Sequence, residues 1–233
     1  MLNSLIKELE GLRNLEQAKN LQRFFKTGKG EYGEGDIFLG IKLPVQREIA
    51  KKYKDLNLTK IGELLKSKIH EHRLIALIIL VNKYKKSSEK EKEKIFHFYL
   101  NNTKFINNWD LVDLSSHRII GNFLLNKDKK ILYTLANSES LWERRIAIVS
   151  TLTFIGKMEF EDTLALSEIL LKDKHDLIHK AVGWALREVG KKEEKVLDDF
   201  LKFHYKNMPR TMLRYAIEKF PEEKRKKYLN GKI

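Results

Sequence analysis

Trp109 and Asp113 are the pair whose residue types and spacing most directly suggest chemistry in this sequence. They lie four residues apart in the segment Asn107–Asp113, which predicts the start of a helix that continues towards Leu125, so both side chains face the same way. An asparagine at the start of this segment supplies a helix cap. Asp113 lies beyond the first turn, where the helix dipole no longer accounts for an acid. A carboxylate there, beside an indole, is paired, solvated or catalytic.

A purely structural interpretation of the same segment stays open. In that case Trp109 is a buried core residue and Asp113 pairs with His117, one helical turn further on. Structural ion pairs imitate functional sites in this way. The rest of the chain must therefore decide between the two interpretations.

A second polar and aromatic stripe is predicted further along the chain. Lys180, Trp184 and Arg187 follow one another at helical spacing. The packed side of the same helix consists of Ile178, Ala181, Val182, Ala185 and Leu186. Gly183 costs about 1 kcal/mol relative to alanine inside a helix, which indicates close approach by another group. The structural alternative is a half-buried tryptophan flanked by cations whose stems lie along apolar surface.

Pairs of arginines begin two further predicted helices. Arg144 and Arg145 fall in a first turn, where the helix dipole disfavours cations, so an anion is expected opposite them. That anion is either a protein carboxylate or a phosphate. Arg210 and Arg214 follow Pro209 with four-residue spacing. Aromatic residues interleaved with cations are typical of a nucleic-acid groove.

The charge balance points the same way. The 233 residues contain 46 Lys and Arg against 32 Asp and Glu, a formal net charge of +14. Such a field attracts polyanions, and phosphate neutralisation supplies most non-specific nucleic-acid affinity. The alternative is a lysine-rich solvated surface. The chain has no cysteine, no apolar run of about 18 residues and no secretory-signal pattern, so we expect a cytoplasmic protein without a membrane segment.

Two further segments resemble a nucleotide site and a metal site but lack residues that those sites require. The glycine-rich segment Thr27–Asp36 lacks the spacing and the terminal Lys-Ser/Thr of a phosphate-binding loop, so we expect a loop or short hairpin that covers a binding surface. His175 and His179 resemble a zinc-protease helix, but the intervening acid is Asp176 and no thiol is available. His175 or Asp176 is expected to cap a helix instead. We expect no metal and no cofactor.

The hydrophobic pattern predicts an all-α protein. Apolar residues recur at three- and four-residue spacing, and alternating strand patterns are nearly absent. Apolar helices open at Glu71, Asn108, Leu141, Leu177 and Met208, at intervals of 31 to 37 residues. More charged helices lie between them, at Ser88–Leu100, Lys127–Asn137, Glu161–Leu171 and Glu193–Tyr205. Tandem two-helix repeats of this kind form a curved α-solenoid with a concave face, here a basic one, and no linker divides residues 1–233.

Three ordered segments carry a family resemblance. Trp109–Asp113, Leu141–Ala147 and Lys180–Arg187, within a region from Phe38 to about Arg214, resemble the AlkD-type DNA alkylation-repair glycosylases, which are built from HEAT-like helical repeats. The resemblance implies hydrolysis of the N-glycosidic bond of N3- or N7-alkylated purines in double-stranded DNA. It also implies that the base is not fully extruded from the duplex, in contrast to most glycosylases.

The resemblance further implies roles for individual residues. Asp113 would lie next to the deoxyribose, Trp109 and Trp184 would pack against the lesion's backbone, and Arg145 would hold DNA near the carboxylate. We add, as further candidate DNA contacts, Lys180, Arg187, Arg144, Arg210, Arg214 and Tyr32. The expected partner is alkylated double-stranded DNA, bound by a monomer.

The chemistry agrees with these residue types. An N3- or N7-alkylated purine is already cationic and leaves without protonation, so one carboxylate suffices where other sugar hydrolases use two. Asp113 can stabilise an oxocarbenium-like sugar and orient water. Trp109 and Trp184 can each add cation–π attraction of roughly 0.5–2 kcal/mol.

The sequence departs from the best-known members at two places. They carry two adjacent tryptophans where this chain has Asn108-Trp109, and an aromatic tyrosine on an earlier helix where this chain has Phe24-Phe25 and the insertion 27–36. Tyr32 is a candidate substitute. One alternative function is therefore a non-catalytic HEAT-like binder of branched or otherwise distorted DNA. Another is a helical-repeat scaffold for acidic proteins.

Overall fold

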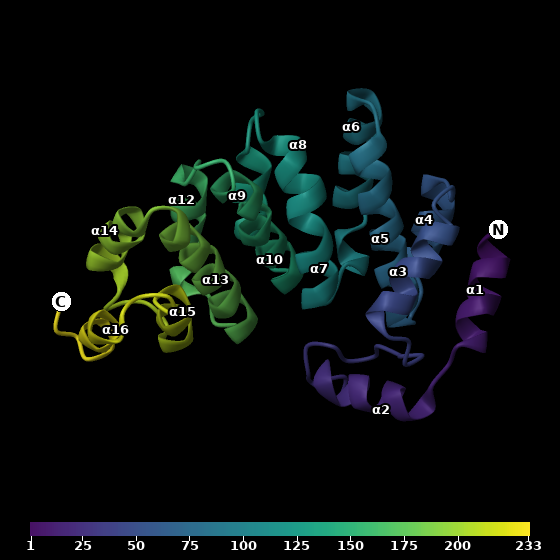
Figure 1. Ribbon diagram of the computed structural model, residues 1–233, viewed down its shortest axis with the longest axis horizontal. Helices are drawn as coiled ribbons and strands as arrows, with labels where there is room; N and C mark the ends of the chain where they lie inside the picture. Colours follow the sequence, from purple (N-terminus) through teal and green to yellow (C-terminus); the bar gives the residue numbers. More distant parts are fainter. The chain divides into compact units, whose positions relative to one another are not determined.

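All regular elements of the protein are helices. The computed structural model describes every residue from Met1 to Ile233 (Figure 1). One isolated parallel bridge, between Ile37 and Ile69, is the only strand-like pairing. The all-α prediction is therefore confirmed. The chain divides into two compact units, Met1–Ser115 and Ser116–Ile233. The single domain expected over residues 1–233 stays a prediction, as does the basic concave face.

The first unit is organised around one buried helix. Its elements are α1 (Leu2–Gly11), α2 (Leu15–Phe24), α3 (Leu43–Lys52), α4 (Leu58–Leu65), α5 (His70–Lys86), α6 (Glu89–Leu100), a 3-10 turn (Thr103–Phe105) and the beginning of α7 (Trp109–Ser116). Helix α5 packs against α3, α4 and α6. It is apolar on all sides from Leu74 to Val81, and 13 of its residues are buried, which makes it the core of the unit. Helix α2 lies crosswise to α3 and α5 in Figure 1.

Side-chain caps fix where several helices of this unit begin. Asn14 accepts a hydrogen bond from the amide of Gln17 at the start of α2, over 2.9 Å. Ser88 and Glu91 form a reciprocal capping box at the start of α6. The predicted helix start at Ser88 is thus confirmed, and at both positions short polar side chains satisfy amides that the helix leaves free.

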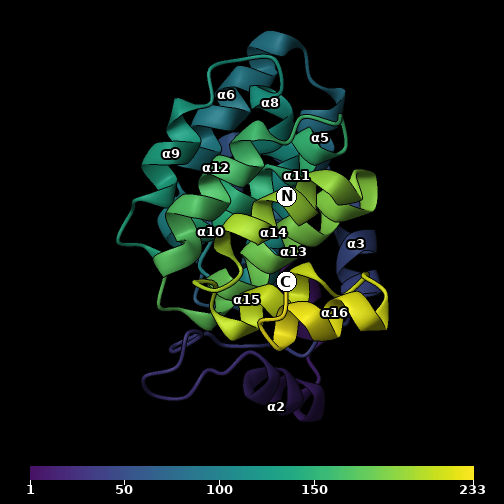
Figure 2. The same cartoon turned by 90° about the vertical axis from the view of Figure 1, so that its left-hand side faces the viewer.

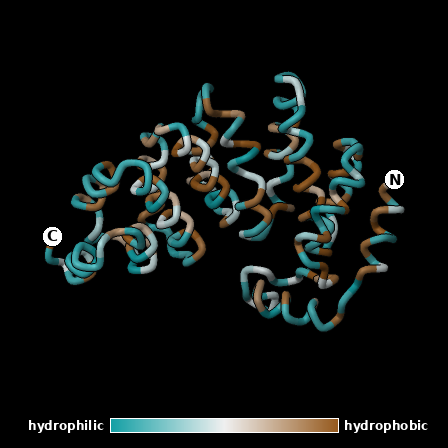
Figure 3. The backbone as a smooth tube through the Cα atoms, in the orientation of Figure 1, coloured by the Kyte–Doolittle hydropathy of each residue, from teal (hydrophilic) through white to brown (hydrophobic).

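The second unit continues the alternation of helices. Its elements are a π-helical turn (His117–Gly121), α8 (Asn122–Leu124), α9 (Lys130–Ala136), α10 (Leu141–Ser150), α11 (Leu152–Ile155), α12 (Glu161–Ile169), a 3-10 turn (Leu170–Lys172), α13 (Asp176–Lys192), α14 (Glu194–His204), α15 (Arg210–Ala216) and α16 (Glu222–Leu229). Helix α13 packs against α10, α14 and α15 (Figure 2). Hydrophobic and hydrophilic segments alternate along most helices, as expected where one face is buried (Figure 3).

The helix predicted from Asn108 to Leu125 is not regular. Helix α7 ends at Ser116, and the chain continues as a π-helical turn to Gly121 before α8. A Cβ atom at Gly121 would overlap the Ser150 carbonyl and lie 2.7 Å from Oγ1 of Thr153. Thr153 also donates a hydrogen bond to the carbonyl of His117. Close packing against α10 and α11 therefore accompanies the widened turn, which single-sequence periodicity does not reveal.

Gly183 allows α13 and α15 to approach closely. A Cβ atom there would lie 2.5 Å from Cβ of Tyr215 and 2.6 Å from the carbonyl oxygen of Met212. This is the close approach that a glycine inside the predicted helix indicated, so that prediction is confirmed. Because both neighbouring atoms belong to a backbone or lie next to one, they cannot move aside without shifting α15.

We predict that Gly183→Ala destabilises the protein although alanine is the better helix former. Overpacking of this kind costs about 1–3 kcal/mol. In a chain of this size each kcal/mol lowers the melting temperature by roughly 2–4 °C. Gly11→Ala is the matched control, because a Cβ at Gly11 meets no atom within 4 Å. Equal melting temperatures for the two variants by calorimetry would contradict the packing argument.

Candidate functional site

Asn108 fixes the start of the helix that carries Trp109 and Asp113. Its Oδ1 accepts a hydrogen bond from the amide of Trp109 over 2.8 Å, and its carbonyl accepts the first helical bond, from Val112, over 3.1 Å. Asn108 is fully buried. The predicted asparagine cap is confirmed at this residue. Trp109 and Asp113, one turn apart, are both half-buried.

The Trp109 indole packs in a column of aromatic rings. It stacks on Phe25 with ring centroids 5.3 Å apart, and it meets Phe24 edge to face at 5.9 Å. Phe25 in turn stacks on Phe38 at 5.1 Å. Phe25 and Phe38 are buried, whereas Phe24 is 63 % exposed. The end of α2 therefore supports the indole from the core side and adds an open aromatic surface beside it.

A buried cluster of charges lies behind this column. His70, the first residue of α5, is 2 % exposed, with Nε2 2.8 Å from Oδ2 of Asp110 and Nδ1 3.3 Å from Oδ2 of Asp36. Arg73 contacts the other oxygen of Asp36 through Nη2 at 2.6 Å. Asn108 donates to Asp36 from Nδ2 over 3.5 Å. Two cations and two carboxylates thus balance one another where water has little access.

The surroundings decide the charge of His70. A neutral imidazole donates from one nitrogen only, so carboxylates at both nitrogens favour the imidazolium. Burial by itself lowers the pKa of His70, but Asp110 and Asp36 outweigh it and raise this pKa to about 9. Burial likewise tends to raise the pKa of Asp36, but His70 and Arg73 hold it below its usual range. Both groups are therefore charged at neutral pH.

Glu71 ties the segment before α3 to α5. Its carboxylate is fully buried and accepts three amide hydrogen bonds, from Leu39 over 3.0 Å, Gly40 over 2.8 Å and Ile41 over 3.2 Å. Gly40 has a φ of +86°, which glycine adopts readily and which turns the three amides towards the carboxylate. The preceding Phe38 is thereby held against Phe25 and His70.

The sequence interpretation used Glu71 only to mark a helix start, and it did not identify His70, Asp36, Asp110 or Arg73 as parts of a site. One signal was available. Four ionisable residues, at positions 70 to 73, open a helix that is otherwise apolar through Val81. Charges rarely enter a core unless they are paired, so their partners had to lie elsewhere in the chain.

In the second unit, the predicted arginine pair has protein partners. Arg144 binds Asp173 through Nε at 2.6 Å and donates from Nη1 to the carbonyls of Ser138 and Glu139. For Arg144 the expected anion is therefore a protein carboxylate. Arg145 is 5 % exposed and donates from Nη1 to the carbonyl of Leu177 at the start of α13. Contacts of these arginines with DNA stay a prediction.

Helix α13 presents the expected stripe. Lys180, Trp184 and Arg187 are half-buried, and the residues predicted to pack are buried, namely Ile178, Ala181, Val182, Ala185 and Leu186. Lys180 pairs with Asp176 at 2.7 Å, and Arg187 pairs with Glu218. The stripe therefore combines a half-buried indole with cations whose carboxylate partners come from α13 and from the turn after α15.

Of the remaining candidates, Arg210 and Arg214 are exposed and Tyr32 is half-buried. Arg210 donates from Nη1 to the carbonyl of Leu229 over 2.7 Å. Arg214 is exposed and has no protein carboxylate within salt-bridge distance. Tyr32 lies in the glycine-rich segment, which forms turns without strand pairing, and its hydroxyl lies 3.5 Å from the carbonyl of Phe24. Of the two forms expected for residues 27–36, the chain adopts the loop.

His175 caps α13, as predicted. Its Nδ1 accepts a hydrogen bond from the amide of Leu177 over 3.1 Å, and Nε2 of His179 is bonded to the carbonyl of Asp173. Nowhere do three or more His, Asp or Glu side chains gather as they would around a metal ion. None of the helices has the length and apolar composition needed to cross a membrane.

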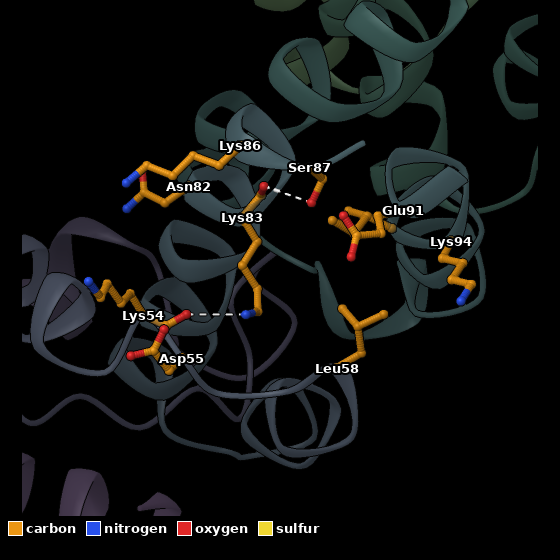
Figure 4. A pocket seen from close by; sticks show the side chains of 10 residues that line it. Lys54, Asp55, Leu58, Asn82, Lys83, Lys86, Ser87, Glu91 and Lys94 are labelled. Carbon is orange, nitrogen blue, oxygen red and sulfur yellow. Dashed lines mark hydrogen bonds between the residues drawn. The ribbon is translucent and has the colours of Figure 1, made fainter. Parts of the chain in front are cut away.

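One cavity lies elsewhere in the first unit. It measures about 430 Å³ and lies between the end of α5, the start of α6 and the segment after α3 (Figure 4). It is lined by Lys54, Asp55, Leu58, Asn82, Lys83, Lys86, Ser87, Glu91, Lys94 and Ile95. None of these is a predicted site residue, and the side chains combine lysines with two acids. Trp109 and Asp113 are the better candidates for chemistry, because a site depends on its functional groups and not on volume alone.

The first unit thus holds Trp109, Asp113 and Tyr32, and the second holds Arg145, Trp184 and the other predicted cations. Within the second unit, α10 packs against α13, so Arg145 and the α13 stripe belong to one pair of neighbouring helices. Convergence of all these residues on one cleft stays a prediction.

Comparison with known proteins places the chain among DNA repair proteins. The model of the DNA alkylation repair enzyme family matches residues 5–220, and the chain belongs to this family. The match includes both units and every predicted site residue. The protein therefore has a role in DNA alkylation repair, with DNA as its substrate or partner.

A solved structure supports the fold. A protein described as a predicted DNA alkylation repair enzyme from Enterococcus faecalis superposes with a TM-score of 0.70 at 17% sequence identity. The similarity covers 90% of this chain and 97% of that one. At this level of identity it supports the helical arrangement and not a particular activity. A comparison with curated proteins finds no significant sequence match.

We predict that Glu71→Ala strongly destabilises the protein. Three buried amides lose their acceptor, and each unsatisfied buried donor costs about 1–3 kcal/mol. Glu71→Gln should have an intermediate effect, because it retains an acceptor for Gly40 and Ile41 but turns an amide donor towards Leu39. Glu63→Ala is the control, since that carboxylate is exposed and pairs with Lys60 on the surface. Urea unfolding midpoints that are the same for Glu71→Ala and Glu63→Ala would refute this assignment.

Proposed function

We propose that this protein is a DNA glycosylase of base excision repair that hydrolyses the N-glycosidic bond of N3- or N7-alkylated purines in duplex DNA. The observation that carries the proposal is the half-buried Trp109–Asp113 pair at the start of α7, supported by the rings of Phe24 and Phe25. Membership of the DNA alkylation repair family supports it.

The reaction requires little of the protein. Alkylation leaves the purine with a positive charge, so the bond between the base and C1′ can break with both electrons passing to the neutral leaving base. The sugar becomes an oxocarbenium-like cation, which the Asp113 carboxylate stabilises while it orients a water molecule. Water adds to C1′ and releases a proton to solvent. The products are the free alkylated base and an abasic site, and the steps require no metal or cofactor.

Aromatic side chains suit a cationic lesion. The Trp109 indole offers a π face near Asp113, and Phe24 is an exposed ring in edge contact with it. Phe24 lies at the end of α2. The best-known members of the family that the sequence resembles carry an aromatic tyrosine on a corresponding earlier helix. Trp184 on α13 is another half-buried indole. Each ring can attract a positively charged purine by roughly 0.5–2 kcal/mol.

Basic residues supply binding. The net charge of +14 favours association with a polyanion. Arg145, Lys180, Arg187, Arg210 and Arg214, together with Arg144 and Tyr32, are the proposed DNA contacts. We propose that the two units act as one HEAT-like domain, with the protein as a cytoplasmic monomer on one duplex.

We predict that the purified protein releases 7-methylguanine or 3-methyladenine from methylated duplex DNA under single-turnover conditions. Asp113→Asn should slow release on the order of 100-fold or more, because it removes the charge that stabilises the sugar cation. Its affinity for DNA should stay unchanged. Base release is measured by chromatography and binding by fluorescence anisotropy.

Asp199→Asn on α14 is the matched control, since that carboxylate has a side chain 50% exposed and should not affect release. If the wild type releases neither base, the glycosylase proposal fails. Tighter binding to branched than to linear duplex, unchanged by Asp113→Asn, would then favour the non-catalytic alternative.

We predict that substitution of Arg214 affects DNA binding, whereas substitution of Arg144 affects stability. Arg214→Gln should weaken binding to any DNA sequence and lower the slope of log affinity against log salt by about 0.9, because one phosphate contact is lost. It should leave the melting temperature unchanged, since Arg214 has no salt-bridge partner. Arg144→Gln should lower the melting temperature, because it breaks the ion pair with Asp173. A salt slope that is unchanged in Arg214→Gln would remove this residue from the DNA interface.

A further inference from the structure

The buried charge cluster of the first unit is attached directly to α7. Asp110, the second residue of this helix, binds His70 through Oδ2 at 2.8 Å. Its other oxygen, Oδ1, accepts a hydrogen bond from the amide of Leu111 over 2.9 Å. Asp110 follows Trp109 and precedes Asp113 by three residues. One carboxylate therefore joins the first turn of α7 to the first residue of α5.

The groups that face His70 come from four segments of the chain. Asp36 lies before α3, and Glu71 and Arg73 belong to α5. Asp110 belongs to α7, and Phe25 directly follows α2. Glu71 is engaged by three backbone amides, and Arg73 binds Asp36. Asp36 and Asp110 are thus the carboxylates that hold the imidazole.

His70 also reaches the Trp109 indole through aromatic contacts. Its ring stacks on Phe38 with centroids 4.6 Å apart and lies 5.0 Å from the centroid of Phe25. Phe25 stacks on the other side against Trp109 at 5.3 Å. A buried cation between such rings gains attraction from their π faces, so its charge also favours this stack.

We propose that His70 is a positioning residue for the reaction proposed above. Its imidazolium, held between Asp36 and Asp110, fixes the first turn of α7 and the Trp109 ring. The same contact thereby fixes the position of Asp113 against the sugar. The inference rests on the proposed glycosylase function for its catalytic consequence, but the positioning of Trp109 can be tested without it.

Loss of the imidazolium proton should loosen this arrangement. A neutral His70 can donate to only one of the two carboxylates, which leaves the other facing a lone pair. Since the pKa of His70 is raised to about 9, the site is fully held at neutral pH and released as the pH rises through this value. Asp36 has its pKa lowered, so it stays ionised over this range.

The first experiment follows base release under single-turnover conditions between pH 7 and pH 10, with spontaneous release subtracted. The wild-type rate should fall above a pH of about 9. His70→Gln should be slower at neutral pH on the order of 10- to 100-fold, because small misplacements of catalytic groups have effects of that size. Its rate should show no alkaline fall, and its DNA affinity should match that of the wild type.

Two further variants sharpen the result. Asp110→Asn removes one of the charges that raise the pKa of His70, so it should move the alkaline fall to lower pH, an effect that simple loss of stability does not produce. His72→Gln is the matched control: this histidine is also buried in α5, but it contacts Ser67 and should leave the profile unchanged. Identical alkaline profiles for the wild type and His70→Gln would overturn the proposal while leaving the glycosylase function intact.

The second experiment does not depend on activity. Protein labelled with 5-fluorotryptophan gives separate ¹⁹F resonances for Trp109, Trp142 and Trp184, which single Trp→Phe variants assign. The Trp109 resonance should shift with a midpoint at a pH of about 9 in the wild type and not in His70→Gln. If it shifts while no base is released, the glycosylase proposal fails and the positioning of Trp109 stands. If it does not shift, His70 does not position this ring.

Discussion

The contact between Asp110 and His70 is the constraint on which the candidate site depends. It joins the start of α7 to the start of α5, the most buried helix of the first unit, and it does so with a charge pair that water cannot easily replace. Through Asp36 and Arg73 the same pair also holds the segment that precedes α3. The glycine-rich loop, the aromatic column and the helix that carries Asp113 therefore share one buried junction.

Around this junction, backbone and side chains fix one another. Glu71 holds the amides of residues 39–41, and this places Phe38 on His70 and Phe25. Such an arrangement positions an indole from the core side while its outer face stays accessible. A site that stabilises a cationic sugar gains most when its groups are already in place before the substrate arrives.

Much of the local structure was predictable from the sequence, because it depends on neighbours in the chain. Spacing within one or two turns is enough to indicate the helix periodicity and the close approach at Gly183. It is also enough to indicate the helix caps at Asn14, Ser88, Asn108 and His175. The resemblance to DNA alkylation-repair glycosylases added the family, which the comparison confirms. The π-helical turn after Ser116 was missed, because it accompanies close contacts with α10 and α11 that periodicity does not contain.

The buried charge cluster could not be predicted, because its members lie 34 and 40 residues apart. The same limit applies to Arg144, where the sequence left a phosphate and a protein carboxylate as alternatives and only the fold brings Asp173 into contact. A single sequence indicates which charged side chains require a partner, but the tertiary structure determines which residue that partner is.

The exposed Phe24 has a consequence for how the protein behaves in solution. An accessible apolar ring favours self-association, and the net charge of +14 opposes it by long-range repulsion between molecules. Repulsion of this kind extends about 10 Å in 0.1 M salt and only about 3 Å in 1 M salt. Colloidal stability is therefore greatest in dilute buffers, and concentrated salt removes the barrier that keeps these rings apart.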